Sequence, residues 1–210
     1  MRYRLGKPCD IKEIVNIHYS IRESYSIGVF AHLGKSFLHQ YYKIILNDKN
    51  QLVVCAEDEN GRIQGFCSAT LNVESQFANI RNHKLALGFS AIKSIVRDPS
   101  LLKSLAERYK SLCENGAEKF IVTKGARGEY WAWSKTYQDS ISALEMHEVH
   151  LKILKDLGVK QLNFEVDTIN KKVLNFHKFN GAEITKIMIL PDGRERVLMR
   201  YNLVDRKSRL

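Results

Sequence analysis

His177 is the residue whose type and setting first suggest chemistry. It lies in the stretch NKKVLNFHKFNGAEI, residues 170–184. At about 3.6 residues per turn, Val173, Phe176 and His177 fall on one helical face, so the imidazole points inward among apolar neighbours. Such a histidine is either a core residue with one ring nitrogen hydrogen-bonded or a group that moves a proton near neutral pH. The pattern alone favours the core role, and only the surrounding elements can change that balance.

The segments around this helix predict a mixed α/β fold. Apolar spacing predicts three further helices, at 10–25, 34–48 and 139–158, with Asp10 as the N-cap of the first. It predicts β-hairpins at 51–72 and 183–203, two strands within 119–134, and one strand at 160–168. Residues 73–118 carry amphipathic helical pieces broken at Asp98-Pro99 and indicate a helical insertion. Because a strand, a helix and a strand follow one another over 129–169, we expect two parallel, adjacent strands joined by a right-handed crossover.

The composition indicates a soluble protein with anionic partners. The chain has 210 residues, 33 Lys and Arg against 23 Asp and Glu, and a net charge of +10. No apolar run approaches the roughly 20 residues that span a bilayer, and no apolar segment follows the basic start, so we expect a cytoplasmic protein without a membrane role. The charge suits phosphorylated substrates or acidic proteins. We do not expect nucleic acid, because no helix-turn-helix or RNP-like pattern is found.

The four cysteines do not indicate a metal site. Cys9, Cys55, Cys67 and Cys113 are scattered, without the close Cys or His spacing that zinc ligands or a disulfide framework show. We therefore expect reduced thiols and no metal.

The order of elements and three local motifs resemble the GNAT superfamily of acyl-CoA N-acyltransferases, over essentially the whole chain outside the insertion. In the helix after that family's fifth strand, Asn170, Val173, Phe176 and His177 match the family's Asn, small apolar, apolar and Tyr positions, and Gly181-Ala182 matches its Gly-Phe. The stretch EDENGRIQGF, residues 57–66, looks like the hairpin between the family's second and third strands. The resemblance implies a GNAT-like mixed, mostly antiparallel sheet with central parallel fourth and fifth strands and helices on both faces.

The third motif corresponds to the family's pyrophosphate loop. The family pattern, Arg or Gln, then x-x-Gly-x-Gly or Ala, falls on Tyr137-Gln138-Asp139-Ser140-Ile141-Ser142, with serines in both glycine positions. Serine still supplies free backbone N–H groups at a helix N-terminus, which is what a pyrophosphate needs. Asp139 adds a negative charge there, and Ser142 with Glu145 also fits an ordinary capping box.

The resemblance implies a role for three sets of residues in acyl transfer. Backbone N–H groups around Trp131, Ala132 and Trp133 would approach the acyl carbonyl. Asn170 and Phe176 would lie along the coenzyme, and His177 stands where the family often has the Tyr that protonates the departing thiolate. Glu129 is the first candidate for the general base, directly or through water. Glu165, whose side chain should share a face with Asn163 and Asp167, is the second.

These observations predict one GNAT-like domain over 1–203, with the insertion at about 73–118 on the acceptor side and a basic tail at 204–210. The expected activity is transfer of an acyl group, most simply acetyl from acetyl-CoA or another acyl-CoA, to a small primary amine, with an amino sugar or sugar nucleotide as first choice. An acyl carrier protein as donor, and a GNAT-shaped binding module without turnover, are the alternatives. A homodimer also stays open.

Overall fold

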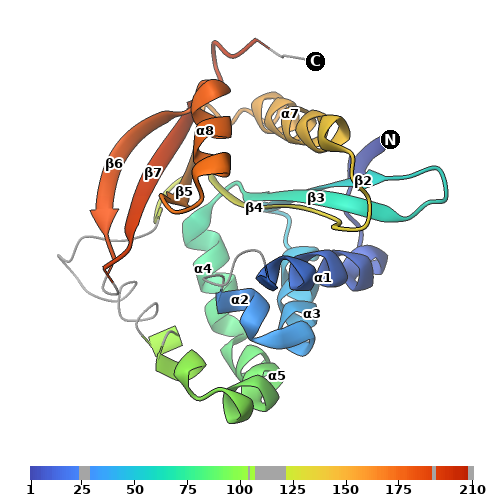
Figure 1. The fold of residues 1–210 in the computed structure, drawn as a ribbon, viewed down its shortest axis with the longest axis vertical. Helices are drawn as coiled ribbons and strands as arrows, with labels where there is room; N and C mark the ends of the chain where they lie inside the picture. Colours follow the sequence, from blue (N-terminus) through green and yellow to red (C-terminus); the bar gives the residue numbers. More distant parts are fainter. Residues whose placement is uncertain (24–28, 104, 107–121, 191–192, 208–210) are drawn as a thin grey trace.

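A computed structural model describes residues 1–23, 29–103, 105–106, 122–190 and 193–207 of the chain. Seven strands form one mixed sheet in the order β1-β2-β3-β4-β5-β7-β6 (Figure 1). In chain order they are β1 (Arg2–Leu5), β2 (Gln51–Glu57), β3 (Ile63–Thr70), β4 (Arg127–Trp133), β5 (Gln161–Asp167), β6 (Glu183–Ile189) and β7 (Glu195–Asn202). All neighbouring strands are antiparallel except β4 and β5, which are parallel.

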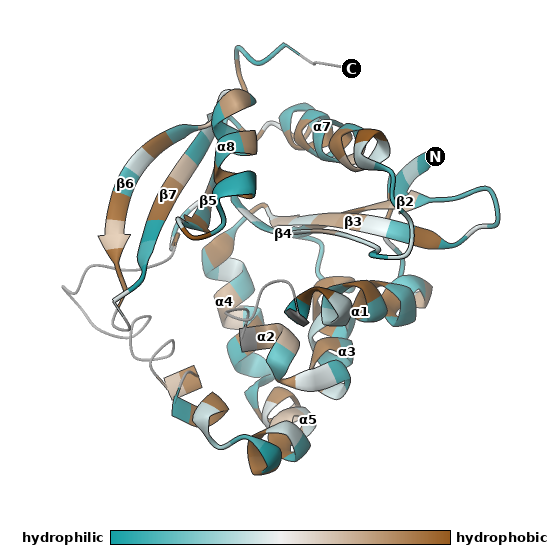
Figure 2. Cartoon of the chain, in the orientation of Figure 1, coloured by the Kyte–Doolittle hydropathy of each residue, from teal (hydrophilic) through white to brown (hydrophobic). Residues whose placement is uncertain are grey.

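Helices cover both faces of the sheet, as Figure 1 shows. The helices of one side are α1 (Ile11–Ser20), α2 (Val29–His32), α3 (Gly34–Ile45), α4 (Val73–Asn82) and α5 (Lys84–Arg97), with 3-10 turns at Pro8–Asp10 and Ile21–Glu23. The other side carries α7 (Ser140–Asp156) and α8 (Lys171–Phe179). Figure 2 shows hydrophobic and hydrophilic residues side by side around these helices, as expected where a helix separates a core from solvent.

The sheet separates two apolar cores, because alternate side chains of each strand point to opposite faces. Along β2, Val53 and Cys55 enter the core under α1 and α3. Leu52, Val54 and Ala56 enter the core under α7 and α8. The two cores together fix which face of β4 and β5 each functional side chain can reach.

The join between β4 and β5 is short. One register pair, Arg127 with Asn163, connects them within the described residues. By contrast, β5 and β7 pair along their whole length, from Gln161 to Asp167. Beyond the single pair the two strands diverge, and Figure 1 shows them running apart beneath α7 and α8. The sheet therefore consists of two halves, β1 to β4 and β5 to β6, joined at one end.

Most predicted elements are confirmed. The structure contains the expected helices at α1, α3, α7 and α8, both hairpins, and the parallel neighbours β4 and β5. Helix α7 ends before Gly158, which has φ of +83° and so suits the left-handed residue after a helix. In the insertion, α5 ends at Arg97 with Asp98 as its C-cap, as the Asp98-Pro99 break predicts. Of the two strand runs within 119–134, the second is β4. Residues 119–121 of the first run, and residues 104 and 107–118 of the insertion, lie outside the described residues.

One strand was missed and one local interpretation was wrong. The chain begins with the short strand β1, whose four residues include two arginines and carry no strand pattern of their own. Asp10 precedes α1 but makes no side-chain hydrogen bond that caps it. Its carboxylate instead accepts hydrogen bonds from the Arg4 guanidinium at 2.7 and 3.0 Å and from the Lys7 N–H at 2.7 Å. Within the described ranges, no helix is long and apolar enough to cross a lipid bilayer.

Candidate active site

A β-bulge in the β3–β4 pairing aims Glu129 toward α3. The register shifts between Cys67 and Ala69, where the Ser68 hydroxyl accepts a hydrogen bond from the Tyr130 N–H at 3.2 Å. Tyr130 packs against the core under α1 and α3, and Glu129 on the same side reaches Tyr41 of α3. A bulge turns two successive side chains to one face, so the first base candidate faces the α1 to α5 side.

Glu129 lies in a buried charged cluster. One oxygen is ion-paired with the Arg127 guanidinium, and the other accepts a hydrogen bond from the Tyr41 hydroxyl at 2.7 Å. The side chains of Arg127 and Glu129 are only 12% and 5% exposed. Burial raises the pKa of Tyr41 well above its usual value, and the nearby Glu129 charge raises it further. Tyr41 therefore stays a hydrogen-bond donor to the carboxylate.

Glu165 of β5 enters the same cluster from the neighbouring strand. One of its oxygens accepts a hydrogen bond from the Val122 N–H. Burial raises the pKa of Glu165, while the charges of Arg127 and Arg196 act in the opposite direction. Arg127 interacts electrostatically with both Glu129 and Glu165. The structure thus brings the two base candidates together around one guanidinium, which their separation in sequence does not reveal.

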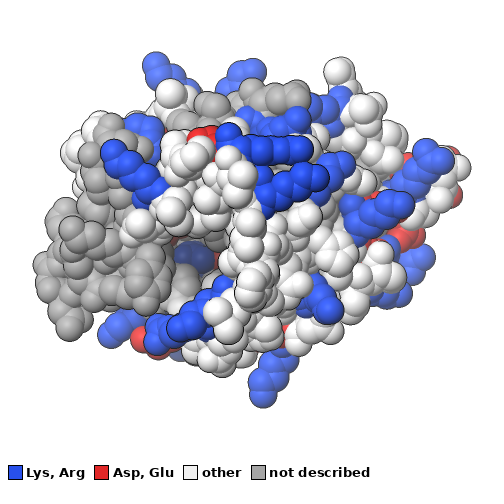
Figure 3. All heavy atoms as spheres, turned by 90° about the horizontal axis from the view of Figure 1, so that it is seen from below, with Lys and Arg blue, Asp and Glu red and all other residues white. Residues whose placement is uncertain are grey.

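The face that Glu165 shares with Asn163 and Asp167 is strongly polar, as predicted from alternation along β5. Asn163 accepts a hydrogen bond from Arg200 at 2.9 Å. Asp167, which is buried, is ion-paired with Arg194 at 2.8 Å and Arg196 at 2.6 Å. Figure 3 views the molecule from the side of α5 and shows a hollow with basic atoms lying deep in it, and further basic side chains spread over the same face. This side of the sheet can receive a polar or anionic ligand.

Gln76 of α4 joins this cluster and was missed at the level of sequence. Its side-chain oxygen accepts a hydrogen bond from Arg127 at 3.2 Å. Its amide nitrogen is buried and has no hydrogen-bond partner among the described residues. The signal that could have found it is its spacing from Val73, which places both residues on the inward face of α4. A buried, unpaired amide is a donor that a ligand oxygen can satisfy.

His177 belongs to α8 and lies on the opposite face of the sheet, with its side chain pointing into the core between α8, α7 and the strands. It is 7% exposed, and Nδ1 is 2.8 Å from the Tyr201 hydroxyl oxygen. Its ring centroid is 4.5 Å from that of Phe164 and 5.3 Å from that of His147. Burial lowers the pKa of His177 to about 4. The inward orientation predicted from the helix is confirmed, and the imidazole is neutral at pH 7.

Trp131 and Phe176 are packed against each other between α7 and α8. Their ring centroids are 4.6 Å apart, and the Trp131 ring is 5.0 Å from His147. The indole N–H donates to the Ala143 carbonyl of α7 at 3.3 Å.

The remaining strand residues predicted at the donor site divide between the faces. Ala132 is buried in the core under α1 and α3. Trp133 points to the α7 side, where its N–H donates to the Tyr137 carbonyl at 2.7 Å and its ring covers Gly65 of β3. This contact holds the loop between β4 and α7 against the strand. Tyr137 and Gln138 of that loop are exposed.

The N-terminus of α7 is capped from within the chain. The Asp139 carboxylate accepts hydrogen bonds from the Ser142 N–H at 2.9 Å and from the Ser142 hydroxyl at 2.6 Å. These two hydrogen bonds lower the pKa of Asp139, so the carboxylate stays ionised. Ser140 and Ile141 are exposed, whereas Ser142 is buried. The N-cap of α7 is therefore Asp139, and Ser142 and Glu145 do not form the capping box that the sequence also allowed.

Two further contacts define the ends of the helices near the site. Glu145 does not complete a capping box but accepts a hydrogen bond from the Tyr3 hydroxyl at 2.6 Å. Asn170 caps α8, since its side-chain oxygen accepts a hydrogen bond from the Val173 N–H at 3.5 Å. Both helix starts thus have ordinary side-chain contacts.

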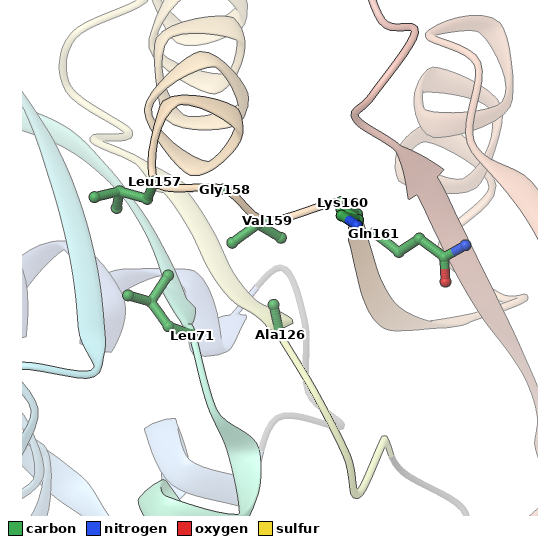
Figure 4. A pocket seen from close by; sticks show the side chains of 7 residues that line it. All are labelled: Leu71, Ala126, Leu157, Gly158, Val159, Lys160 and Gln161. Carbon is green, nitrogen blue, oxygen red and sulfur yellow. The ribbon is translucent and has the colours of Figure 1, made fainter.

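An open groove of about 310 Å³ lies apart from Glu129, Glu165 and His177. It is lined by Leu71, Ala126, Leu157, Gly158, Val159, Lys160 and Gln161, at the end of α7 and the start of β5. Figure 4 shows aliphatic side chains on its walls and the Gln161 side chain extending away from them. It brings together no pair of acid, base or nucleophile, so the candidate site is the region where β4 and β5 diverge.

Comparison with solved structures identifies the fold. No family model matches the sequence, and no curated protein matches it. The chain resembles an aminoglycoside 6'-acetyltransferase type Ii, with a TM-score of 0.58, 10% identity, and coverage of 99% of this chain and 100% of that chain. It also resembles a ribosomal-protein-alanine N-acetyltransferase from Brucella melitensis, with a TM-score of 0.59, 11% identity and coverage of 96% and 99%.

A third resemblance is to a structure that contains a bound donor. It is the GNAT superfamily phosphinothricin acetyltransferase from Sinorhizobium meliloti in complex with AcCoA, with a TM-score of 0.59, 13% identity, and coverage of 99% of this chain and 92% of that chain. The chain therefore has the GNAT fold of acyl-CoA N-acyltransferases, over nearly its whole length. The expected fold class is confirmed.

Proposed function

We propose that this protein is an N-acyltransferase, most simply an N-acetyltransferase, that moves an acyl group from acyl-CoA to a small primary amine. The observation that carries the proposal is the arrangement where β4 and β5 stop pairing. Glu129 and Glu165 lie around Arg127 on one face, and the neutral imidazole of His177 lies under the other. The fold, shared with N-acetyltransferases of several kinds, supports the same activity.

Each chemical step has a candidate group in this region. A carboxylate takes a proton from the ammonium of the acceptor, and the resulting amine attacks the thioester carbonyl. Backbone N–H groups of Trp131, Ala132 and Trp133 are the proposed donors to the tetrahedral oxyanion, a role that can contribute about 3 kcal/mol. When Tyr201 donates to Nδ1 of His177, Nε2 carries an N–H that can donate a hydrogen bond to the leaving sulfur.

The acceptor is proposed to be an amino sugar or a sugar nucleotide. The unpaired amide of Gln76 suits a sugar hydroxyl or carbonyl oxygen. The basic residues of the same face and the net charge of +10 suit a phosphate. We place this acceptor on the α1 to α5 side of the sheet, beside the insertion, and the reaction in the cytoplasm.

Incubation of the protein with radiolabelled acetyl-CoA and a library of amines tests the proposal. We expect labelled product from amino sugars or their nucleotides and little from nonpolar amines. An amine profile that is unrelated to hydroxyl or phosphate groups would contradict the proposed acceptor while preserving acyl transfer. No product from any amine would contradict the activity itself.

One alternative donor is supported by two observations. The Asp139 carboxylate already occupies the α7 N-terminus, where a pyrophosphate would otherwise find free N–H groups. The net positive charge also suits an acidic acyl carrier protein, whose pantetheine arm lacks the nucleotide. Parallel assays with acyl-CoA and acyl carrier protein discriminate between the donors. Binding of donor without turnover from either would instead support a GNAT-shaped binding module.

A further inference from the structure

Glu129 is held by groups that use both of its oxygens. Arg127 pairs with Oε1, and the Tyr41 hydroxyl donates to Oε2. Protonation of this carboxylate would break the charge balance of a buried guanidinium and displace a hydrogen bond from Tyr41. Removing one partner of a buried ion pair is strongly destabilising. Because both of its oxygens already accept hydrogen bonds from the chain, Glu129 is suited to holding Arg127 and Tyr41 in place.

Glu165 has a different set of contacts. Oε1 accepts a hydrogen bond from the Val122 N–H, and no hydrogen bond to Oε2 is found among the described residues. The charged groups that face it are Arg127 and Glu129 from β4 and Arg196 from β7. Because Glu129 already neutralises Arg127, a proton on Glu165 leaves no unpaired guanidinium beside it.

We propose that Glu165 is the general base of the reaction and that Glu129 is a positioning residue that neutralises Arg127. This inference rests on the proposed acyl transfer. The carboxylate of Glu165 takes a proton from the acceptor ammonium, and the freed nitrogen lone pair forms the N–C bond. The C–S bond then breaks as the carbonyl re-forms, and its electron pair stays on sulfur. The sulfur takes a proton from solvent while the His177 N–H donates a hydrogen bond to it, and the nitrogen loses its second proton to solvent to give the neutral amide. Glu165 releases its proton to solvent before the next turnover.

Electrostatics supports the same assignment. Burial raises the pKa of Glu165, the charge of Glu129 raises it further, and Arg127 lowers it. A base whose pKa is raised toward the working pH is more effective at proton transfer. Loss of the Glu129 charge should therefore lower the pKa of Glu165, without removing the base.

The test compares the pH profiles of wild type, Glu165→Gln and Glu129→Gln, with thermal melting of each. Glu165→Gln should lower kcat at pH 7 by roughly 100-fold while the protein stays folded. Its kcat should rise again at higher pH, because more of the acceptor is then present in solution as the free amine. Glu129→Gln should keep an acidic limb but move it to lower pH, with a lower melting temperature. Glu183→Gln, at an exposed position that begins β6, is the matched control and should change neither.

Two results would overturn the assignment. One is a Glu165→Gln variant with wild-type turnover and an unchanged acidic limb. The other is the reversed pattern, in which Glu129→Gln loses the limb and Glu165→Gln only shifts it. If the wild-type chain makes no product from any donor and amine, the proposed function fails first, and this outcome is distinct from both.

Discussion

His177 combines an inward position with a neutral ring, and this combination defines its test. Burial lowers its pKa to about 4. Any change in turnover that is caused by protonation of His177 should therefore occur near pH 4 and not near neutral pH. At working pH it would therefore act as a neutral N–H that donates a hydrogen bond to the leaving sulfur. We expect His177→Phe to lower turnover by roughly 100-fold with folding kept, and His177→Tyr to restore part of it.

The control for this prediction is His150→Phe, measured in the same assays. His150 is also a buried histidine of the α7 side but has no assigned role. If His177→Phe and His150→Phe both leave turnover intact and only change the melting temperature, His177 is a core residue hydrogen-bonded to Tyr201.

Asp139 gives a second prediction at the scale of one residue. Asp139→Ala removes a negative charge and an N-cap from α7, so we expect tighter CoA binding by titration calorimetry. It should also lower stability by about 1 kcal/mol, the usual cost of losing a cap. Asn72→Ala is the matched control, because Asn72 caps α4 through the Ser75 N–H at 2.9 Å. Equal CoA binding by both variants would show that the Asp139 charge does not oppose the donor.

At the scale of elements, the Trp133 ring of β4 packs directly on Gly65 of β3 and so stabilises the pairing of these two strands. A Cβ at Gly65 would lie 2.2 Å from the Trp133 ring. Gly65→Ala should therefore displace the indole and destabilise the chain by about 1–3 kcal/mol, with a change in tryptophan fluorescence. Gly88→Ala is the control: a Cβ there meets nothing within 4 Å, and alanine favours the helix α5. Equal melting temperatures of the two variants would contradict a tight contact.

Elements with strong local patterns were predictable, and those that depend on distant partners were not. The hairpin turn at Gly61 and the long apolar face of α7 are local signals. Strand β1 is four residues long and gains its identity only by pairing with β2. Glu148 looks like a solvent residue of α7, yet it is buried and ion-paired with Arg206, which follows 58 residues later.

The same distinction applies to the candidate site. The helical spacing of His177 predicts that it points inward, which is confirmed. The sharing of Arg127 by Glu129 and Glu165 depends on a bulge and on the single β4–β5 pair. Neither feature has a signature in the residues of one segment. Sequence therefore identified both carboxylates separately but could not place them in one cluster.

At the scale of the whole molecule, buried histidines should make the fold sensitive to mild acid. Burial lowers the pKa of His18 and His177 from 6.5 to about 4 and that of His150 to about 3, and it lowers the pKa of His147 as well. The unfolded chain then binds more protons below pH 6.5. The free energy of unfolding should therefore be highest above pH 6.5 and should decrease as the pH falls toward 4.

Urea denaturation at several pH values measures this effect. A shift from 6.5 to about 4 corresponds to about 3 kcal/mol for one histidine. His150→Phe should make the fall between pH 6.5 and 4 less steep, whereas a substitution at exposed His83 should leave it unchanged. A free energy of unfolding that stays constant from pH 6.5 to 5 would contradict the prediction.

The single register pair between β4 and β5 also has a consequence for how the chain is made. Strands β1 to β4 are neighbours in chain order, with α1 and α3 packed beneath them. They can pair while the ribosome is still adding β5, β6 and β7, because only Arg127 and Asn163 link the two halves in register. The amides of β2 and β3 should accordingly exchange with deuterium more slowly than those of β6, the edge strand of the later half. The surface on which the proposed base sits is then completed only when the last strands dock.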